Sequence, residues 1–242
     1  MKKIPPFSYF DVLEACTQPG CPFCRLAEKS VNGYLDALLY EQVNDPGTRE
    51  ALSYSQGFCN EHAHRLPDVN MGASLGIAII YRDLVNQVAG EIEKAHYALP
   101  SKLQQVQESL DRDKPAVATE ATVRSLRPRA RCPACAHRDA METIALAAML
   151  DALPNDERMR TALKSSSGIC LPHLRRAFEL TRTEAAFVVL RDIAQAKVKT
   201  LLGELDEFIR KNDHRFNKEE FGPEGDSWRR AFAWIVGQKG IQ

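Results

Sequence analysis

The chain has 242 residues, which is enough for one large domain or two of ordinary size around a substantial hydrophobic core. Hydrophobic residues make up 44% and charged residues 26%, the usual shares for a soluble globular protein. The 32 basic and 32 acidic side chains balance, so no net field recruits nucleic acid or an anionic membrane, and we expect neither as a partner.

The N-terminal stretch has two lysines but no apolar run of the length found in a signal peptide. The longest apolar stretch, residues 75–81, is far shorter than the ~20 residues that cross a bilayer. We therefore expect a cytoplasmic protein without a membrane span. In such a chain, seven cysteines favour metal ligands or redox thiols over disulfides.

In chain order, residues 1–20 are interrupted by prolines and Gly20, and we expect irregular structure with one helical turn over 9–15. From Pro22, apolar residues recur every three or four positions and predict a helix that ends near Asn44. The dipeptide Asp45-Pro46 then predicts an N-cap and the first position of a short helix. Gly57 ends that helix and precedes another short one.

Longer helical patterns follow at residues 75–97 and 102–111, and the second half repeats the plan up to a long amphipathic helix over 184–209. Ser227 is expected to cap a final helix, 228–236, whose aromatic residues we expect in the core. No stretch alternates with period two. These patterns predict an all-α fold, an internally duplicated helical bundle with pseudo-twofold symmetry.

The duplication is clearest in a motif of cysteines and histidines. Residues 21–24 read Cys-Pro-Phe-Cys, and 34 residues later Cys59-Asn60-Glu61-His62 follows. The same arrangement returns, with the same gap, as Cys-Pro-Ala-Cys and Cys-Leu-Pro-His. Each of the four ligand-type residues moves by 111 positions, giving the second set Cys132, Cys135, Cys170 and His173.

These repeats suggest a division of the chain into five segments. We expect an irregular N-terminal segment and two metal-binding helical units, with a linker between them and a C-terminal extension that ends in a helix. The corresponding ranges are 1–20, 21–110, 111–131, 132–210 and 211–242.

Three thiolates and one imidazole form the Cys₃His set typical of structural zinc. We predict two Zn²⁺ ions per chain, one in each copy, held by Cys21, Cys24, Cys59 and His62 and by Cys132, Cys135, Cys170 and His173. Four protein ligands leave no open position for substrate, so we assign no catalytic residue and favour a non-enzymatic protein.

Several residues near the motif have a predicted role. Gly57 and Gly168, two positions before a ligand cysteine, are expected to allow a left-handed backbone. Arg49 and Arg160, also 111 positions apart, either offset the charge of the thiolates or cap their short helices. Cys16 has no counterpart in the second copy, and we expect a small semi-buried residue or a spare thiol.

Cysteines in similar patterns also serve redox chemistry, haem attachment and iron–sulfur clusters. A thioredoxin-type redox pair requires a βαβ context, which is missing, and covalent haem attachment requires a histidine where Arg25 and Ala136 stand. An iron–sulfur cluster accepts the same ligands and remains the alternative to zinc. The arginines between 124 and 131 fit a solvated basic loop better than a nucleic-acid contact.

The two Cys-Pro-x-Cys…Gly-x-Cys-x-x-His units, together with Gly-Asp-Ser-Trp-Arg-Arg at 225–230, resemble a family of uncharacterised prokaryotic proteins. The resemblance covers most of residues 15–210. It implies a helical fold and supports metal binding, but the family has no assigned activity.

Two functional classes follow from the sequence. The first is a metal-stapled scaffold, adaptor or ligand-binding protein that presents a groove to a protein or small-molecule partner. The second is a redox or metal-handling protein that uses an iron–sulfur cluster or an exchangeable metal at the same ligands.

Overall fold

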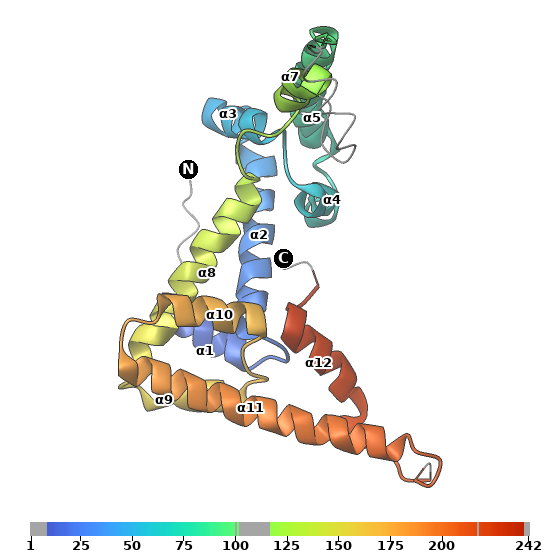
Figure 1. The fold of residues 1–242 in the computed structure, drawn as a ribbon. Coiled ribbons are helices and arrows are strands. Elements are labelled where there is room, and N and C mark those ends of the chain that lie inside the picture. Colours follow the sequence, from blue (N-terminus) through green and yellow to red (C-terminus); the bar gives the residue numbers. More distant parts are fainter. Residues whose placement is uncertain (1–8, 100, 102–116, 217, 240–242) are drawn as a thin grey trace. The chain divides into compact units, whose positions relative to one another are not determined.

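A computed structural model describes residues 9–99, 101, 117–216 and 218–239 (Figure 1). Over these residues the fold consists of eleven α-helices and two short 3₁₀ helices, with no strand, as the sequence predicted. The helix expected over residues 102–111 lies outside the described part. None of the helices in that part is both long and apolar enough to cross a membrane.

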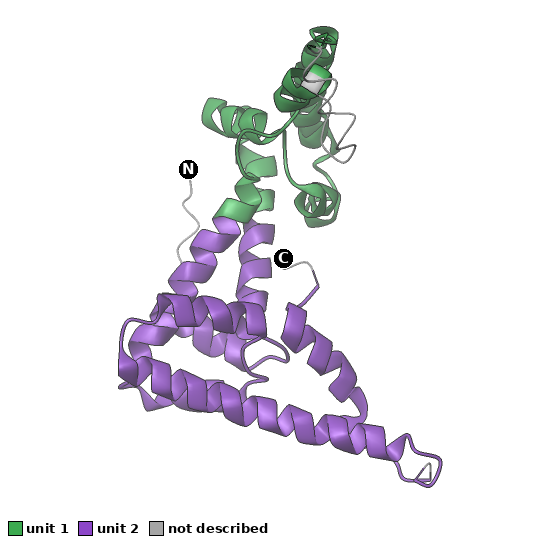
Figure 2. Cartoon of the chain, viewed as in Figure 1, with its two compact units in different colours: residues 1, 34–136 green, residues 2–33, 137–242 purple. Residues whose placement is uncertain are grey.

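The chain divides into two compact units (Figure 2). Unit 1 comprises residues 34–136 and unit 2 residues 2–33 and 137–242. Two helices belong to both: α2 (Pro22–Glu41) begins in unit 2, and α8 (Pro133–Ala152) begins in unit 1. The remaining elements of unit 1 are α3 (Pro46–Ser55), α4 (Asn60–Val69), α5 (Ser74–Glu93), the 3₁₀ helix η1 (Val117–Thr119) and α7 (Glu120–Ser125).

The remaining elements of unit 2 are α1 (Tyr9–Cys16), α9 (Glu157–Ser165), α10 (Leu171–Leu180), α11 (Glu184–Lys211), η2 (Pro223–Asp226) and α12 (Ser227–Val236). Its core forms where α1, α2, α8 and α9 to α11 bring their apolar faces together. Fully buried side chains fill it, among them Val12, Phe23, Leu146, Met149, Leu163 and Leu190. The ligand-type cysteines of this unit lie in the same core.

Unit 1 has a smaller core between the end of α2 and the helices α3 to α5. Its large buried hydrophobic side chains include Leu35, Leu38, Leu52, Phe58, Leu66, Ile80 and Leu84. The segment expected as a linker is partly helical and is tied to α3, because Arg129 N and Ala130 N both donate to the Tyr54 carbonyl, at 2.7 and 3.1 Å.

Both short helices after α2 and α8 begin as the sequence predicted. The Asp45 carboxylate accepts from Thr48 N at 2.7 Å, and the Asp156 carboxylate accepts from Arg158 N at 2.7 Å. These bonds satisfy backbone donors that the first turn of a helix leaves open. Asp156 also accepts from the Tyr9 hydroxyl at 2.5 Å, which fastens α1 to the start of α9.

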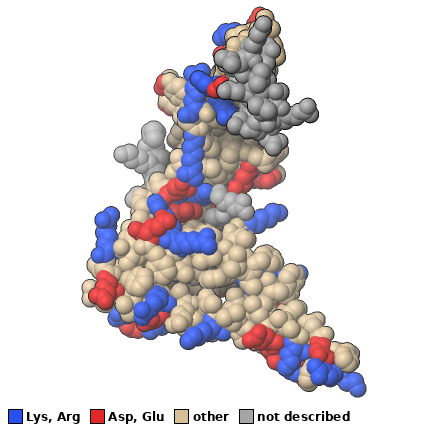
Figure 3. Space-filling model, viewed as in Figure 1, with Lys and Arg blue, Asp and Glu red and all other residues tan. Residues whose placement is uncertain are grey.

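The end of α11 is fixed by ion pairs. Arg210 binds Glu207 and Glu219, and Lys211 binds the buried Glu224 of η2 at 2.6 Å. Basic and acidic side chains therefore alternate around this end of α11, as Figure 3 shows on one face. These contacts position η2, and with it the start of α12.

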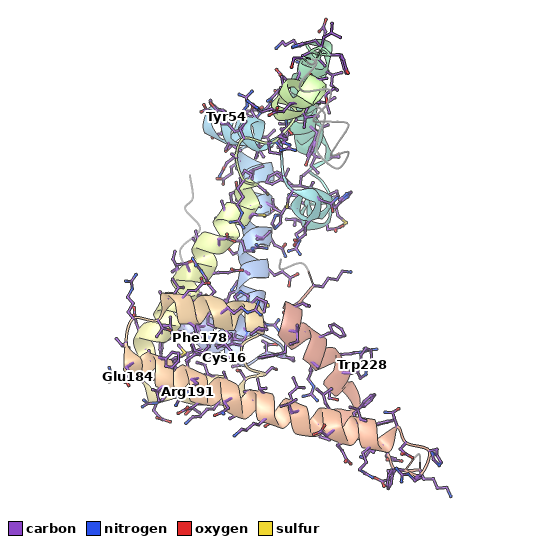
Figure 4. All side chains as sticks on the ribbon, in the orientation of Figure 1. Cys16, Tyr54, Phe178, Glu184, Arg191 and Trp228 are labelled. Atoms are coloured by element: carbon purple, nitrogen blue, oxygen red, sulfur yellow. The ribbon has the colours of Figure 1, made fainter. Side chains whose placement is uncertain are left out.

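The expectation that the aromatic residues of α12 are core residues is wrong for two of them. Trp234 packs against the core of unit 2, but Trp228 and Phe232 are 44% and 55% exposed. Figure 4 labels Trp228 on α12. The two exposed residues share one face because four residues separate them, and α12 packs through its other side against α10 and α11. The N-cap also differs, since Ser227 is the first residue of the helix and Asp226 precedes it.

Two glycines precede the cysteines that start α4 and α10. Gly57 and Gly168 both have φ +90°, which confirms the predicted left-handed backbone. A Cβ at Gly57 would lie 3.0 Å from Leu84 Cδ1, and one at Gly168 would lie 3.3 Å from Lys197 Cγ. Any other residue at these two positions would have a strained backbone, and its Cβ would be crowded by a neighbouring side chain.

We expect Gly57→Ala and Gly168→Ala each to lower the free energy of unfolding by about 1–2 kcal/mol, because alanine disfavours positive φ. Gly90→Ala and Gly203→Ala are matched controls, since these glycines are helical and a Cβ there meets nothing within 4 Å. The controls should gain about 0.5–1 kcal/mol from the higher helix propensity of alanine. Chemical denaturation of the four variants measures the difference, and equal effects at all four sites would contradict the assigned strain.

Candidate metal centres

The eight predicted ligand residues come together in two clusters. Cluster A lies in unit 2 and consists of Cys21, Cys24, Cys170 and His173. Cluster B lies in unit 1 and consists of Cys59, His62, Cys132 and Cys135. Within each cluster, one potential ligand atom per residue lies within 4.8 Å of all the others.

The pairing of the half-sites is not the predicted one. We expected each copy to complete its own Cys₃His set, but each Cys-x-x-Cys pair meets the Cys-x-x-His pair of the other copy. The physical reason is the straight helix after each Cys-x-x-Cys pair. Helices α2 and α8 have 20 residues each, so each carries the chain about 30 Å away from the pair at its start.

The distances inside each cluster suit one tetrahedral ion. In cluster A, Cys24 Sγ lies 3.6 Å from Cys170 Sγ, and His173 Nδ1 lies 3.1–3.6 Å from the three sulfurs. In cluster B, Cys59 Sγ lies 3.7 Å from Cys135 Sγ, and His62 Nδ1 lies 3.2–3.6 Å from its three sulfurs. Zn–S bonds of ~2.3 Å and Zn–N bonds of ~2.0 Å at tetrahedral angles require about 3.8 Å and 3.5 Å for these separations.

Every half-site sits at the start of a helix. The carbonyls of Cys21 and Cys132 accept from the amides four residues on, at 3.3 and 3.0 Å, while Cys59 and Cys170 are the N-caps of α4 and α10. Each cluster therefore has two helix N-termini beside its sulfurs. The positive ends of the helix dipoles stabilise thiolates, the form in which cysteine binds metal.

In cluster A, the sulfurs and the imidazole share protons. Burial raises the pKa of Cys21, but hydrogen bonds with Cys170, Cys24 and His173 outweigh it and bring that pKa well below its ordinary value. Burial lowers the pKa of His173, but its bonds to Cys170, Cys21 and Glu142 raise it to about 12. Hydrogen bonds with Cys170 and Cys21 raise the pKa of Cys24. A metal ion that enters this cluster must therefore displace protons from the imidazole and the thiols.

Cluster A also has an outer layer that the sequence analysis missed. His173 turns Nδ1 to the sulfurs and Nε2 to Glu142, whose carboxylate oxygen is 3.4 Å away. The buried Arg138 lies 3.7 Å from the same carboxylate oxygen. A carboxylate on the second ring nitrogen fixes the tautomer and orientation of a metal-binding histidine. The repeat pattern does not single out Glu142, because the residue 111 positions earlier is Val31, which is not acidic.

The clusters differ in exposure. All four side chains of cluster A are buried, whereas Cys59 and Cys135 of cluster B are only partly buried. Burial, followed by the charge of Cys132, raises the pKa of Cys135 to about 12. Cluster B is therefore the more accessible of the two to solutes.

Arg49 and Arg160 act as helix caps. Arg49 donates to the Val43 carbonyl at 3.1 Å and pairs with Asp83, and Arg160 donates to the Pro154 carbonyl at 2.9 Å and pairs with Glu157. Val43 and Pro154 lie just beyond the ends of α2 and α8. Of the two roles considered for these arginines, capping is the one that their contacts support.

Cys16 belongs to neither cluster. It lies at the end of α1 in the core of unit 2 (Figure 4). Burial, followed by the charge of Cys21, raises its pKa to about 11. The expected small buried residue is therefore what the structure contains, and its thiol is a weak nucleophile.

The fold and its clusters define an all-helical protein with two Cys/His centres that could hold metal ions. The chain belongs to the family of unknown function DUF6062, whose model matches residues 4–241. It is 24% identical over 229 residues to an uncharacterised 23.9 kDa protein in the xynA 3′ region of Caldicellulosiruptor sp. (strain Rt8B.4), covering 93% of this chain and 99% of that protein. No solved structure matches the chain significantly.

The geometry predicts an order of thiol reactivity in chelator-treated protein. We expect iodoacetamide to modify Cys59 faster than Cys16, because Cys59 is partly exposed and Cys16 is buried with a pKa of about 11. Time-resolved peptide mass spectrometry gives each rate, and unfolded protein in guanidinium is the control in which the order should vanish. Faster labelling of Cys16 than of Cys59 would contradict the described burial.

Proposed function

We propose that the protein binds one Zn²⁺ in each cluster and works as a non-enzymatic scaffold, adaptor or ligand-binding protein. The observation that carries this proposal is the closed donor set: three sulfurs and one imidazole nitrogen at tetrahedral separations in each cluster. A catalytic zinc site keeps one position open for water or substrate. Four protein ligands at each ion favour a structural role.

The same distances weigh against an iron–sulfur cluster. In such a cluster the protein sulfurs bind different iron atoms and must surround several metal and sulfide atoms. Here the ligand atoms approach one another to 3.1–3.7 Å in eight pairs, four in each cluster. These contacts suit a single ion, so the support for a redox or metal-handling role through a cluster is weaker.

We also infer that the chain arose by internal duplication. Helices α2 and α8 have bounds that differ by 111 at both ends, and so do α4 and α10. The same offset relates the two capping aspartates, the two glycines at φ +90° and the two arginine caps: Asp45 and Asp156, Gly57 and Gly168, Arg49 and Arg160. Independent origin would have to reproduce each of these details.

Double variants test the metal sites and their pairing together. Cys24→Ser with Cys170→Ser removes two ligands of cluster A, so this protein should retain about one zinc per chain, at cluster B. Cys24→Ser with Cys59→Ser damages both clusters and should retain none. Elemental analysis of the purified variants gives the counts.

Pairing within each copy would reverse these two results, since Cys24 and Cys59 would then share one site. Cys16→Ser is the matched control and should keep two zincs, because Cys16 belongs to neither cluster. Wild-type protein that contains iron and sulfide, with no zinc, would contradict the proposed function.

Glu142→Gln should weaken only the centre at cluster A. The substitution keeps the shape of the side chain but removes the charge beside His173 Nε2, and such partners typically change metal affinity by about 10–100-fold. We expect half of the zinc to be lost to a chelator about tenfold faster, with the other half unchanged. Glu179→Gln, in an exposed pair with Arg176, is the control. Equal acceleration of both halves would refute the assigned contact.

A further inference from the structure

Unit 2 contains a cleft of about 390 Å³ beside cluster A. One end is formed by the loops that deliver the ligand cysteines, through Gly20, Cys21, Gly168 and Cys170. The two long sides come from α11 and α12, and the residues that they contribute include Lys197, Val198, Leu201, Glu204, Arg230, Ala233 and Trp234. Its volume lies within the ~300–1,000 Å³ range of small-molecule sites.

Apolar side chains form much of the cleft wall. Val198 and Leu201 face it from α11, and Ala233 and Trp234 face it from α12. A narrow recess of about 10 Å³ adjoins it, and Gly168, Lys197 and Trp234 line both spaces. The recess is otherwise lined by apolar residues, Leu163, Ile169, Leu190, Ile193 and Ala194. An apolar chain or ring that enters the cleft would be removed from water on several sides.

The two cations that line the cleft, Arg230 and Lys197, differ in their hydrogen-bond partners. Arg230 is fully paired, because it binds two carboxylates, Glu204 at 2.5 Å and Asp226 at 2.7 Å, and has no charge left to offer a ligand. Lys197 donates to the Ser166 carbonyl, a neutral acceptor, at 2.5 Å, and no carboxylate of the described residues forms an ion pair with it. Burial lowers the pKa of Lys197, which reflects the cost of holding its charge away from water.

We propose that this cleft binds a small amphiphilic carboxylate. Its apolar part would lie on Leu201 and Trp234, and its carboxylate would pair with Lys197. A charge-assisted bond from an ammonium group to a carboxylate is stronger than its bond to a carbonyl, so the ligand would give Lys197 a charged partner in place of a neutral one. The inference rests on the proposed function in that the loops of cluster A form one end of the cleft.

Residues 78–84 resemble residues 187–193 at an offset of 109, and at this offset the position that corresponds to Lys197 is Val88. Gly57 is covered by Leu84 and Tyr81, whereas its counterpart Gly168 is covered by Lys197. The binding cleft is therefore specific to unit 2.

Tryptophan fluorescence tests this inference directly. The chain has two tryptophans, and Trp228→Phe removes the exposed one, so that Trp234 in the cleft wall is the remaining reporter. Titration of this otherwise full-length, metal-loaded protein with sodium octanoate should give a saturable change in emission. 1-Octanol has the same chain without the charge and should bind about tenfold more weakly.

In the same background, Lys197→Met should weaken octanoate binding about tenfold and leave octanol binding nearly unchanged. Lys199→Met is the matched control, because Lys199 lies two residues further along α11, is exposed and does not line the cleft. It should bind octanoate as the parent does.

Absence of a saturable change with octanoate would overturn the inference, and so would octanol binding as tightly as octanoate. Equal affinities in the Lys197→Met and Lys199→Met variants would overturn the role of Lys197. Metal content is measured on each sample. Normal zinc without binding counts against the cleft alone, whereas octanoate binding by protein that never contains zinc counts against the proposed function.

Discussion

The structure depends on the closure of each Cys/His cluster by residues that are far apart in the chain. The contacts that join the two half-sites link residues 146–152 positions apart in cluster A and 70–76 positions apart in cluster B. A cross-link that closes a loop of 100 residues removes about 4.7 kcal/mol of entropy from the unfolded chain, although engineered links often deliver less. Metal bound at these clusters would therefore act on the stability of the whole chain.

This closure depends on several local features. Each Cys-x-x-Cys pair begins a 20-residue helix, and each Cys-x-x-His pair begins a 10-residue helix after a glycine at φ +90°. Two helix N-termini therefore stabilise the thiolates of each cluster. Around this shared plan the clusters differ, since Glu142 orients His173 in cluster A while cluster B is more exposed. The same Cys₃His ligand set therefore has different surroundings in the two clusters.

The chemistry-bearing residues and most helices were predictable from the sequence because they depend on local patterns. Apolar periodicity identified α2 and α11, and the Asp45 cap and the two glycines adopt the conformations that their residue types favour. The pairing of half-sites was not predictable from spacing. An offset of 111 relates the half-sites equally well whether each copy closes its own site or the two copies exchange. Only the length of α2 and α8, about 30 Å each, indicated exchange.

The remaining differences between the predicted and the observed structure come from tertiary contacts. Trp228 and Trp234 are the same residue type, yet Trp234 packs on the core of unit 2 and Trp228 is 44% exposed. The cleft likewise depends on α11 and α12 coming together beside the loops of cluster A. Such contacts between distant segments have no periodic signature in the sequence.

The central claim is that each cluster holds one zinc ion with three sulfur ligands and one nitrogen ligand. X-ray absorption spectroscopy at the zinc edge of the purified protein measures this coordination directly. Three sulfurs at about 2.3 Å and one nitrogen at about 2.0–2.1 Å around each of two zincs are the expected result. A shell of oxygen and nitrogen ligands, or iron with bridging sulfide in place of zinc, would contradict it.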